Sequence, residues 1–542
     1  MPRNAALLFA VTAGECPQAR FDKINRLHCQ KTVGNSCITS AMPGLHQYNA
    51  ADIHFLATDT LTKLPKLAAF LFGALAIPGF APFYLYPLPV LSLAGLFWLW
   101  RNASSWKQAT LIGFVFGLGF FGAGISWIYV SLHDFGGMPM PMAALATTGL
   151  CAFMALFPAA AGALSVRAGV PRLAAAPLAW VLMEWTHGWI FTGFPWLAVG
   201  YSQIPHSPLA GLAPMVGVYG VSLAVAGCAA LIVWLAPHKK RLLVALLAVW
   251  LAGSALKQIE WSRPLGAPIS VSLLQGNIPQ DFKWQPEAIR HTLDTYLDLA
   301  RRYPAQLVVL PETALPLILE QVPPEYLKAL AQAGGQDVLV GVVEQEGENY
   351  YNSMVSLGAA PRQRYRKEHL VPFGEFIPFK AALGWIYRDW LHIPLADLAR
   401  GGKQQQPLAL AGQRVAVNIC YEDAFGEEII RQLPQATLLV NTSNDAWYGR
   451  SLAAHQHLQM SQARALETGR MMLRATNTGA TAIIDAQGRL LAEAQHFTTT
   501  ALTGTAQGYS GITPYVRFGN WPAISLIFLL FALLRLRGRN QR

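Results

Sequence analysis

The sequence predicts a polytopic α-helical membrane protein that carries an inserted, water-soluble α/β domain. Of its 542 residues, 53% are hydrophobic and only 13% are charged, a composition typical of a membrane protein. About eight apolar runs have the length that crossing a bilayer requires. A long segment of mixed, soluble-looking sequence, from about residue 260 to 515, separates the last apolar run from the others.

The apolar runs are expected to form transmembrane helices. Runs of about 20 residues, the length that a bilayer requires, lie near 65–82, 84–100, 109–131, 141–165, 172–187, 208–237, 240–257 and 520–535. The connecting loops alternate in charge. The loops at 101–107, 167–172, 238–241 and the tail 535–542 are basic, whereas those at 82–89, 133–141 and 187–207 contain neither Lys nor Arg.

This alternation predicts the orientation, because basic loops stay in the cytoplasm. We expect both termini to be cytoplasmic and the segment 260–515 to lie outside, in the periplasm of a bacterial cell inner membrane. The net charge of +11 follows from the same topology. Basic residues are spread over short loops and form no stripe with aromatic residues, so nucleic acid is not an expected partner.

Four regions follow from these patterns. Residues 62–259 are expected to form a seven-helix transmembrane region, 260–515 the inserted domain, and 516–542 a final helix with a basic tail. Residues 1–61 are polar and contain Cys16, Cys29 and Cys37 without metal-like spacing. We interpret them as a disordered extension or a start assigned too far upstream, because signal-peptide cleavage would upset the loop alternation.

Strand-like and helix-like patterns alternate in the inserted segment. The expected strands are 270–275, 306–310, 338–344, 415–419, 437–441 and 481–485, and the expected helices are 286–302, 325–332 and 452–474. In the last helix, Leu458, Ala465 and Met472 share one face. The residues 485–488 (Asp-Ala-Gln-Gly) are typical of a hairpin turn. This order predicts a layered α/β domain whose functional residues follow strand ends.

Cys420 ends one of these strands and is the only cysteine of the inserted segment. A disulfide within the segment is therefore not expected. A thiol attacks as its thiolate, which requires a nearby base or cation. Two other polar clusters supply candidates: Glu312 can take the proton, and Lys367 can stabilise both the thiolate and the oxyanion of a tetrahedral intermediate.

The motifs around these residues resemble those of the carbon-nitrogen hydrolase (nitrilase) superfamily. They are Leu274–Pro279 with Trp284, Pro311–Ala314, Tyr365–Pro378, Cys420–Glu422 and Asn441–Trp447. With the hydrolase-like segment inserted before the last span, residues 62–536 more narrowly resemble the apolipoprotein N-acyltransferase family. The resemblance implies a nitrilase-like αββα sandwich beside about eight transmembrane helices.

The resemblance also implies a division of roles. Glu312 would be the general base, Lys367 the oxyanion-stabilising cation, Cys420 the nucleophile and Glu375 a supporting carboxylate. Tyr421, Glu422 and Trp284 would border the substrate. Cys420 would take the sn-1 acyl chain of a phospholipid, typically phosphatidylethanolamine, and pass it to the α-amine of a diacylglyceryl-cysteine on an apolipoprotein.

Two other functions remain open from the residues alone: a membrane-tethered, nitrilase-type amidase acting on a small amide, and a transporter with a degenerate domain. The candidate triad opposes the transporter. The apolar arm Phe376–Leu398, with Trp385 and Trp390, opposes the amidase, because such a composition suits a membrane interface. We expect this arm to gate the access of lipid.

Other polar residues are interpreted without a role in the chemistry. His455 and His457 point to different faces of a helix and favour a polar surface over a metal site. No cofactor or metal is expected, since neither a phosphate-binding glycine loop nor a metal-ligand spacing is present. Glu184 is costly in lipid and is a functional candidate. The remaining predictions are inert packing for Cys151 and Cys228 and a solvated helix face for Arg464, Glu467, Arg470 and Arg474.

Overall fold

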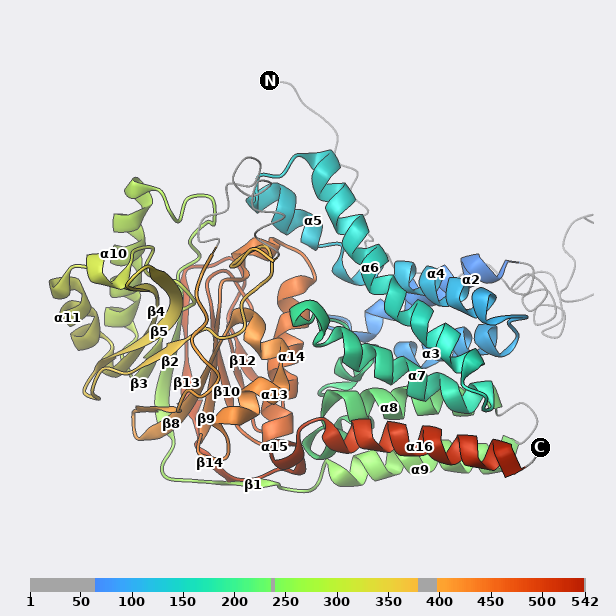
Figure 1. The fold of residues 1–542 in the computed structure, drawn as a ribbon. Helices are drawn as coiled ribbons and strands as arrows, with labels where there is room; N and C mark the ends of the chain where they lie inside the picture. The colour runs from blue at the N-terminus through green and yellow to red at the C-terminus, as the bar shows by residue number, and fades with distance from the viewer. Residues whose placement is uncertain (1–63, 235–238, 379–396, 541–542) are drawn as a thin grey trace, which may run out of the picture. The chain divides into compact units, whose positions relative to one another are not determined.

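The computed structural model describes residues 64–234, 239–378 and 397–540. A helical region comes first, followed by two β-sheets with their own helices, and a last long helix closes the chain (Figure 1). The predicted extension 1–61 lies outside the described residues. So do Trp385, Trp390 and most of the predicted arm.

Helices stand at the positions of the predicted spans. Three helical segments of the described chain, Trp106–Ile125, Met140–Arg167 and Pro208–Trp234, have the length and apolar composition that crossing a membrane requires. The helices of this region are α2 (Pro65–Leu75), α3 (Pro87–Arg101), α4 (Trp106–Ile125), α5 (Ile128–Val130), α6 (Met140–Arg167), α7 (Arg172–His187), α8 (Ala213–Trp234), α9 (Lys239–Leu256) and, at the end of the chain, α16 (Trp521–Asn540).

Small residues let α4 and α6 pack closely. A Cβ added at Gly113 would lie 2.3 Å from the carbonyl oxygen of Pro158, and one at Gly117 would lie 2.7 Å from the Cβ of Ala155. Such close van der Waals contact of small residues is typical of closely packed apolar helices. Larger side chains at these two glycines would push the helices apart.

The inserted segment forms two six-stranded mixed sheets. One has the order β13-β2-β3-β4-β5-β6 and the other the order β12-β11-β10-β9-β8-β7. Strands of the first sheet are β2 (Ile269–Gln275), β3 (Ala305–Val309), β4 (Gly335–Glu346), β5 (Asn349–Gly358), β6 (Arg364–Arg366) and β13 (Thr500–Ala506). Strands of the second are β7 (Leu408–Leu410), β8 (Gln413–Ile419), β9 (Leu438–Ser443), β10 (Met472–Thr476), β11 (Ala482–Ile484) and β12 (Leu490–Glu493). A short ribbon pairs β1 (Ser262–Pro264) with β14 (Tyr509–Gly511).

The alternation of side chains along each strand builds four layers. In β3, Leu307 and Val309 pack between the sheets, whereas Val308 packs under α10 (Pro286–Arg302) and α11 (Pro324–Ala333). In β9, Leu438 and Val440 pack between the sheets, and Leu439 packs against the helices of the other side. These are α13 (Gly426–Ile429) and α14 (Ala453–Thr468), with α15 (Pro514–Phe518) beyond them. The result is an αββα sandwich (Figure 1).

One predicted helix is too long. The pattern 452–474 predicts a single helix, but α14 ends at Thr468, and Met472 begins β10. Gly469 adopts a left-handed φ of 63° and caps the helix, as glycine commonly does. The chain then pairs in parallel with β9. The turn predicted at 485–488 is present, because it joins the antiparallel strands β11 and β12.

Helix α14 is polar and nevertheless buried. Every residue of it except His455 is buried, because one face packs on the second sheet and the other contacts the helical region. Gln456 Oε1 accepts hydrogen bonds from the indole Nε1 atoms of Trp127 at 3.2 Å and Trp196 at 2.7 Å. Its Nε2 donates to the carbonyl of Gly124. The solvated face predicted for Arg464, Glu467, Arg470 and Arg474 is therefore wrong: all four are 0–1% exposed.

The first prediction concerns this contact. Gln456→Leu should lower the free energy of unfolding by about 2–5 kcal/mol, since each buried donor left without a partner costs about 1–3 kcal/mol. Thermal unfolding of the detergent-purified chain measures the effect. Gln487→Leu, at an exposed position of the β11–β12 turn, is the matched control. Equal unfolding midpoints for the two variants would contradict the stabilising role of Gln456.

Candidate active site

Three polar residues that follow strands meet at one end of the sandwich. Glu312 follows β3, Lys367 follows β6 and Cys420 follows β8. Lys367 Nζ lies 3.1 Å from Glu312 Oε1, and the charges of both residues act on the Cys420 thiol. The structure thus brings together three residues that lie far apart in the sequence. All three are buried, with exposed fractions of 6%, 1% and 9%.

Glu312 is held as a carboxylate. Its Oε1 accepts from Lys367 Nζ and, at 2.7 Å, from Asn352 Nδ2, and its Oε2 accepts from the backbone N–H of Asn444 at 3.0 Å. Burial disfavours the charged form, but Lys367, Asn352 and Lys283 outweigh it and keep the pKa of Glu312 below its ordinary value. Each carboxylate oxygen has two lone pairs, so Oε2 can still take a proton.

Lys367 is held between two carboxylates. Its ammonium group lies 2.8 Å from Glu375 Oε1 in addition to its contact with Glu312. Burial opposes its charge, but Glu312 and Glu375 outweigh this and raise the pKa of Lys367 well above its ordinary value. Glu375 is itself fixed, since it accepts from Asn352 Nδ2 at 3.0 Å and from the backbone N–H of Val371 at 2.8 Å. The cation is therefore permanent and immobile.

Cys420 sits in a strained turn. Its φ is +53°, a left-handed conformation that non-glycine residues rarely adopt and that the surroundings must hold in place. Its carbonyl oxygen is contacted by Asn441 Nδ2 at 3.2 Å and by His457 Nε2 at 3.0 Å. Burial and the charge of Glu312 raise the pKa of the Cys420 thiol well above its ordinary value, although Lys367 opposes this. The resting Cys420 side chain is therefore a neutral thiol.

Glu422 ties the Cys420 turn to the segment that carries Lys367. Its carboxylate accepts from the backbone N–H groups of Ile419, Glu368 and His369 and from the Tyr365 hydroxyl, at 2.7–3.1 Å. Burial raises the pKa of Glu422 to about 7, even though these backbone donors lower it. These hydrogen bonds occupy the Glu422 carboxylate, and they fix the backbone of the two segments relative to each other.

Tyr421 and Trp284 have different surroundings. Tyr421 is buried, and its hydroxyl donates to the carbonyl of Gly193 at 2.9 Å, in the helical region. Its ring stacks near Phe194 and Trp196. Trp284 is partly exposed and lies beside Lys283, whose Nζ is 5.8 Å from the ring centroid. Trp385 and Trp390, the other aromatic candidates, fall outside the described residues.

Sequence reasoning missed a buried network beneath the Cys420 turn. Arg474 donates to Asn441 Oδ1 at 2.5 Å and pairs with Asp445 at 3.0 Å and Asp423 at 3.4 Å. His457 is fully buried there, so its predicted surface position is wrong. A helical pattern gives no sign that both faces of α14 are covered. The motif Asn441–Trp447 was the one sequence signal of this buried network, because two of its residues, Asn441 and Asp445, are partners of Arg474.

Lys283 is a second buried cation that the sequence did not reveal. It is 2% exposed, and its Nζ donates to Thr313 Oγ1 at 2.7 Å, next to Glu312. Burial lowers the pKa of Lys283 to about 8, while the charge of Glu312 opposes this. Its positive charge adds to that of Lys367 at Glu312 and favours the carboxylate over the acid.

Glu184 accepts hydrogen bonds within the helical region. Its Oε1 accepts from Trp180 Nε1 at 3.0 Å and from the backbone N–H of Val199 at 2.8 Å. It thus joins α7 to the following 3₁₀ turn (Val199–Gln203). This arrangement accounts for a buried carboxylate in the helical region without assigning it a role in the chemistry.

The second prediction follows from the thiol's surroundings. The rate at which iodoacetamide alkylates Cys420 should keep rising above pH ~8.5, the ordinary pKa of a cysteine, because burial and Glu312 raise the thiol's pKa. Glu312→Gln should shift the profile to lower pH, and Lys367→Met should shift it to higher pH. Mass spectrometry of the Cys420 peptide measures the rate. A wild-type profile that levels off below pH ~8.5 would contradict the raised pKa.

Comparison with known proteins places both parts of the chain in one family. Residues 72–231 match the family model of the apolipoprotein N-acyltransferase N-terminal domain, and residues 270–511 match that of carbon-nitrogen hydrolase. An apolipoprotein N-acyltransferase of Nitrosomonas europaea is 56% identical over 483 residues, which cover 87% of this chain and 96% of the relative. Those of Methylococcus capsulatus and Chromobacterium violaceum are 48% and 46% identical, over 86% and 88% of this chain and 95% of each relative. The chain therefore belongs to the apolipoprotein N-acyltransferase family.

Proposed function

We propose that the chain transfers an acyl group from a phospholipid to the N-terminal amine of a lipoprotein through a thioester on Cys420. The observation that carries this proposal is the buried contact of Lys367 with Glu312, whose charges both act on the Cys420 thiol. The donor is a phospholipid such as phosphatidylethanolamine, and the acceptor is the diacylglyceryl-cysteine of an apolipoprotein. Membership of an N-acyltransferase family supports transfer over hydrolysis.

In the first step, Cys420 Sγ attacks the carbonyl carbon of the sn-1 ester, and Glu312 takes the thiol proton. A base placed at a neutral thiol suits this step, because proton transfer accompanies attack. Lys367 stabilises the oxyanion of the tetrahedral intermediate. The ester C–O bond then breaks, and Glu312 returns the proton to the glycerol oxygen. A lysophospholipid leaves, and the acyl chain remains as a thioester.

In the second step, the neutral α-amine of the lipoprotein attacks the thioester carbonyl. Glu312 takes one proton from the amine nitrogen, and Lys367 again stabilises the oxyanion. The C–S bond breaks, and Glu312 gives its proton to Sγ. The products are an amide and the regenerated thiol. Glu375 orients Lys367 throughout, and Trp284 borders the lipid on the exposed side of the site.

We also propose that the chain is a multi-pass protein of the bacterial inner membrane with a periplasmic catalytic domain. Helices at all of the predicted span positions and the absence of Lys and Arg from three loops support this topology. Several hydrogen bonds between the helical region and α14 or the Cys420 turn involve these loops or their edges, at Ala81, Tyr84, Gly193 and Ile204. In this topology the first membrane region is 62–259 and the catalytic domain is 260–515. The last helix and the basic tail are 516–542.

The third prediction tests the acyl-enzyme. Incubation of the purified chain with phosphatidylethanolamine should add an acyl mass to the Cys420 peptide, removable with hydroxylamine and absent from Cys420→Ala. Peptide mass spectrometry is the measurement, and the Cys228 peptide is the internal control. If Cys420 acquires no acyl group from the lipid but turns over a small amide, the chain is a membrane-tethered amidase instead.

The fourth prediction distinguishes the role of Glu312 as a base from the effect of its charge on the pKa of the Cys420 thiol. Glu312→Gln should slow acyl transfer about 10²–10⁴-fold, even though the same change moves thiol alkylation to lower pH. Lys367→Met should slow transfer about 10²–10³-fold, because one oxyanion-stabilising group is lost. Single-turnover transfer to a diacylglyceryl peptide measures both. Wild-type rates for Glu312→Gln would exclude Glu312 as the base.

A further inference from the structure

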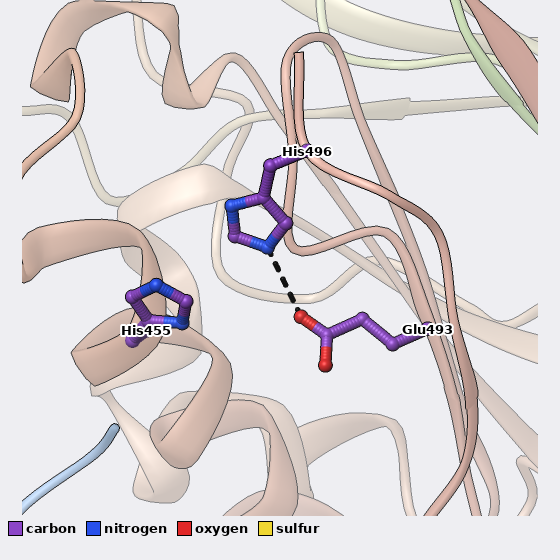
Figure 2. Close-up of side chains that lie close together, drawn as sticks. All are labelled: His455, Glu493 and His496. Atoms are coloured by element: carbon purple, nitrogen blue, oxygen red, sulfur yellow. Dashed lines mark hydrogen bonds and ion pairs between the residues drawn. The ribbon is translucent and has the colours of Figure 1, made fainter. Parts of the chain in front are cut away.

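Three potential metal ligands gather at the beginning of α14. His455 lies in the first turn of this helix, Glu493 is the last residue of β12, and His496 follows in the connection to β13. One ligand atom of each residue lies within 4.8 Å of the others. Figure 2 shows the Glu493 carboxylate directed at the ring of His496, with the ring of His455 beside them.

The His496 ring nitrogen Nε2 has two close polar partners. The backbone N–H of Ala480 donates to it at 3.0 Å, and this bond uses the single lone pair that a neutral imidazole nitrogen offers. Glu493 Oε1 also lies 3.0 Å from it, and the carboxylate oxygen has no proton to share with the nitrogen. A cation that bridges Nε2 and Oε1 takes this lone pair in place of the Ala480 N–H and separates the two acceptors. Their separation is close to the roughly 3.3 Å expected for two ligands of one tetrahedral Zn²⁺.

His455 is available as the third ligand. It is the one residue of α14 that is not buried. Within the described part of the chain, neither of its ring nitrogens has a hydrogen-bond partner. Its ring centroid lies 4.9 Å from that of His496. An imidazole nitrogen without another partner can ligate a metal ion.

We propose that His455, Glu493 and His496 bind a Zn²⁺ ion that clamps the β12–β13 connection to α14. Two imidazoles and one carboxylate form a known ligand set for Zn²⁺, with water in the fourth position. The three ligand atoms lie within 4.8 Å of one another, so binding draws the His455 nitrogen towards the ion. The adjacent residues Gln456 and His457 hold the two tryptophans and the Cys420 carbonyl. The ion therefore stiffens the helix that supports the nucleophile, without joining the chemistry.

The fifth prediction measures the metal directly. The full chain is purified through a tag without histidines, stripped with EDTA, incubated with Zn²⁺ and dialysed before elemental analysis. His455→Ala/His496→Ala should retain one Zn²⁺ per chain fewer than the wild type. His291→Ala, at an exposed position of α10, is the matched control and should retain the wild-type amount. Equal zinc in the wild type and the double variant would overturn the proposal.

Two further readouts guard against a folding artefact. Zn²⁺ should raise the unfolding midpoint of the stripped wild type by about 3 °C or more and leave that of the double variant unchanged. Glu493→Gln, a conservative change at an exposed side chain, should weaken Zn²⁺ binding about tenfold or more while its metal-free midpoint stays at the wild-type value. An unchanged affinity in Glu493→Gln would remove Glu493 from the site and refute the three-ligand arrangement.

Discussion

The rest of the structure depends on one constraint: α14 is a polar helix buried on both sides, so each of its polar groups requires a partner. Towards the helical region, Gln456 binds Trp127 and Trp196, and Gln459 binds the backbone at Ala81 and Ile204. Towards the second sheet, its polar residues meet the network of Arg474, Asp423 and Asp445. These bonds fix the distance between the helical region and the nucleophile.

The same network explains how the left-handed conformation of Cys420 is kept in place. A left-handed Cys420 persists only where its surroundings determine it. Here His457 and Asn441 contact its carbonyl, and Glu422 binds the backbone N–H of the preceding Ile419 and that of Glu368 in the Lys367 segment. The surroundings also shift the pKa values of two buried carboxyl groups in opposite directions. Glu312 lies beside two lysines and stays ionised, whereas Glu422 is buried among backbone donors and its pKa rises.

The site is also continuous with the helical region. Tyr421, next to the nucleophile, donates to Gly193 and stacks near Phe194 and Trp196. Trp127 packs against Trp196 and Tyr448, and Tyr448 neighbours His457. Aromatic rings from the connections of the helical region and from the inserted segment therefore surround one side of the Cys420 turn. For lipid substrates this is a physical advantage, because an acyl chain can reach the thiol across an apolar, water-poor surface.

The sequence by itself predicted the helices of the helical region, most strands around the candidate site, and Glu312, Lys367 and Cys420 as candidate residues, because hydrophobic period and local motifs are properties of short segments. Only the tertiary structure decided which polar residues are buried. Arg464 and Arg474 have an ordinary charged-helix pattern, and nothing in the local sequence shows that a sheet covers one side of α14 and the helical region the other. It likewise placed His455 beside Glu493 and His496, since ligands from separate segments meet only after folding.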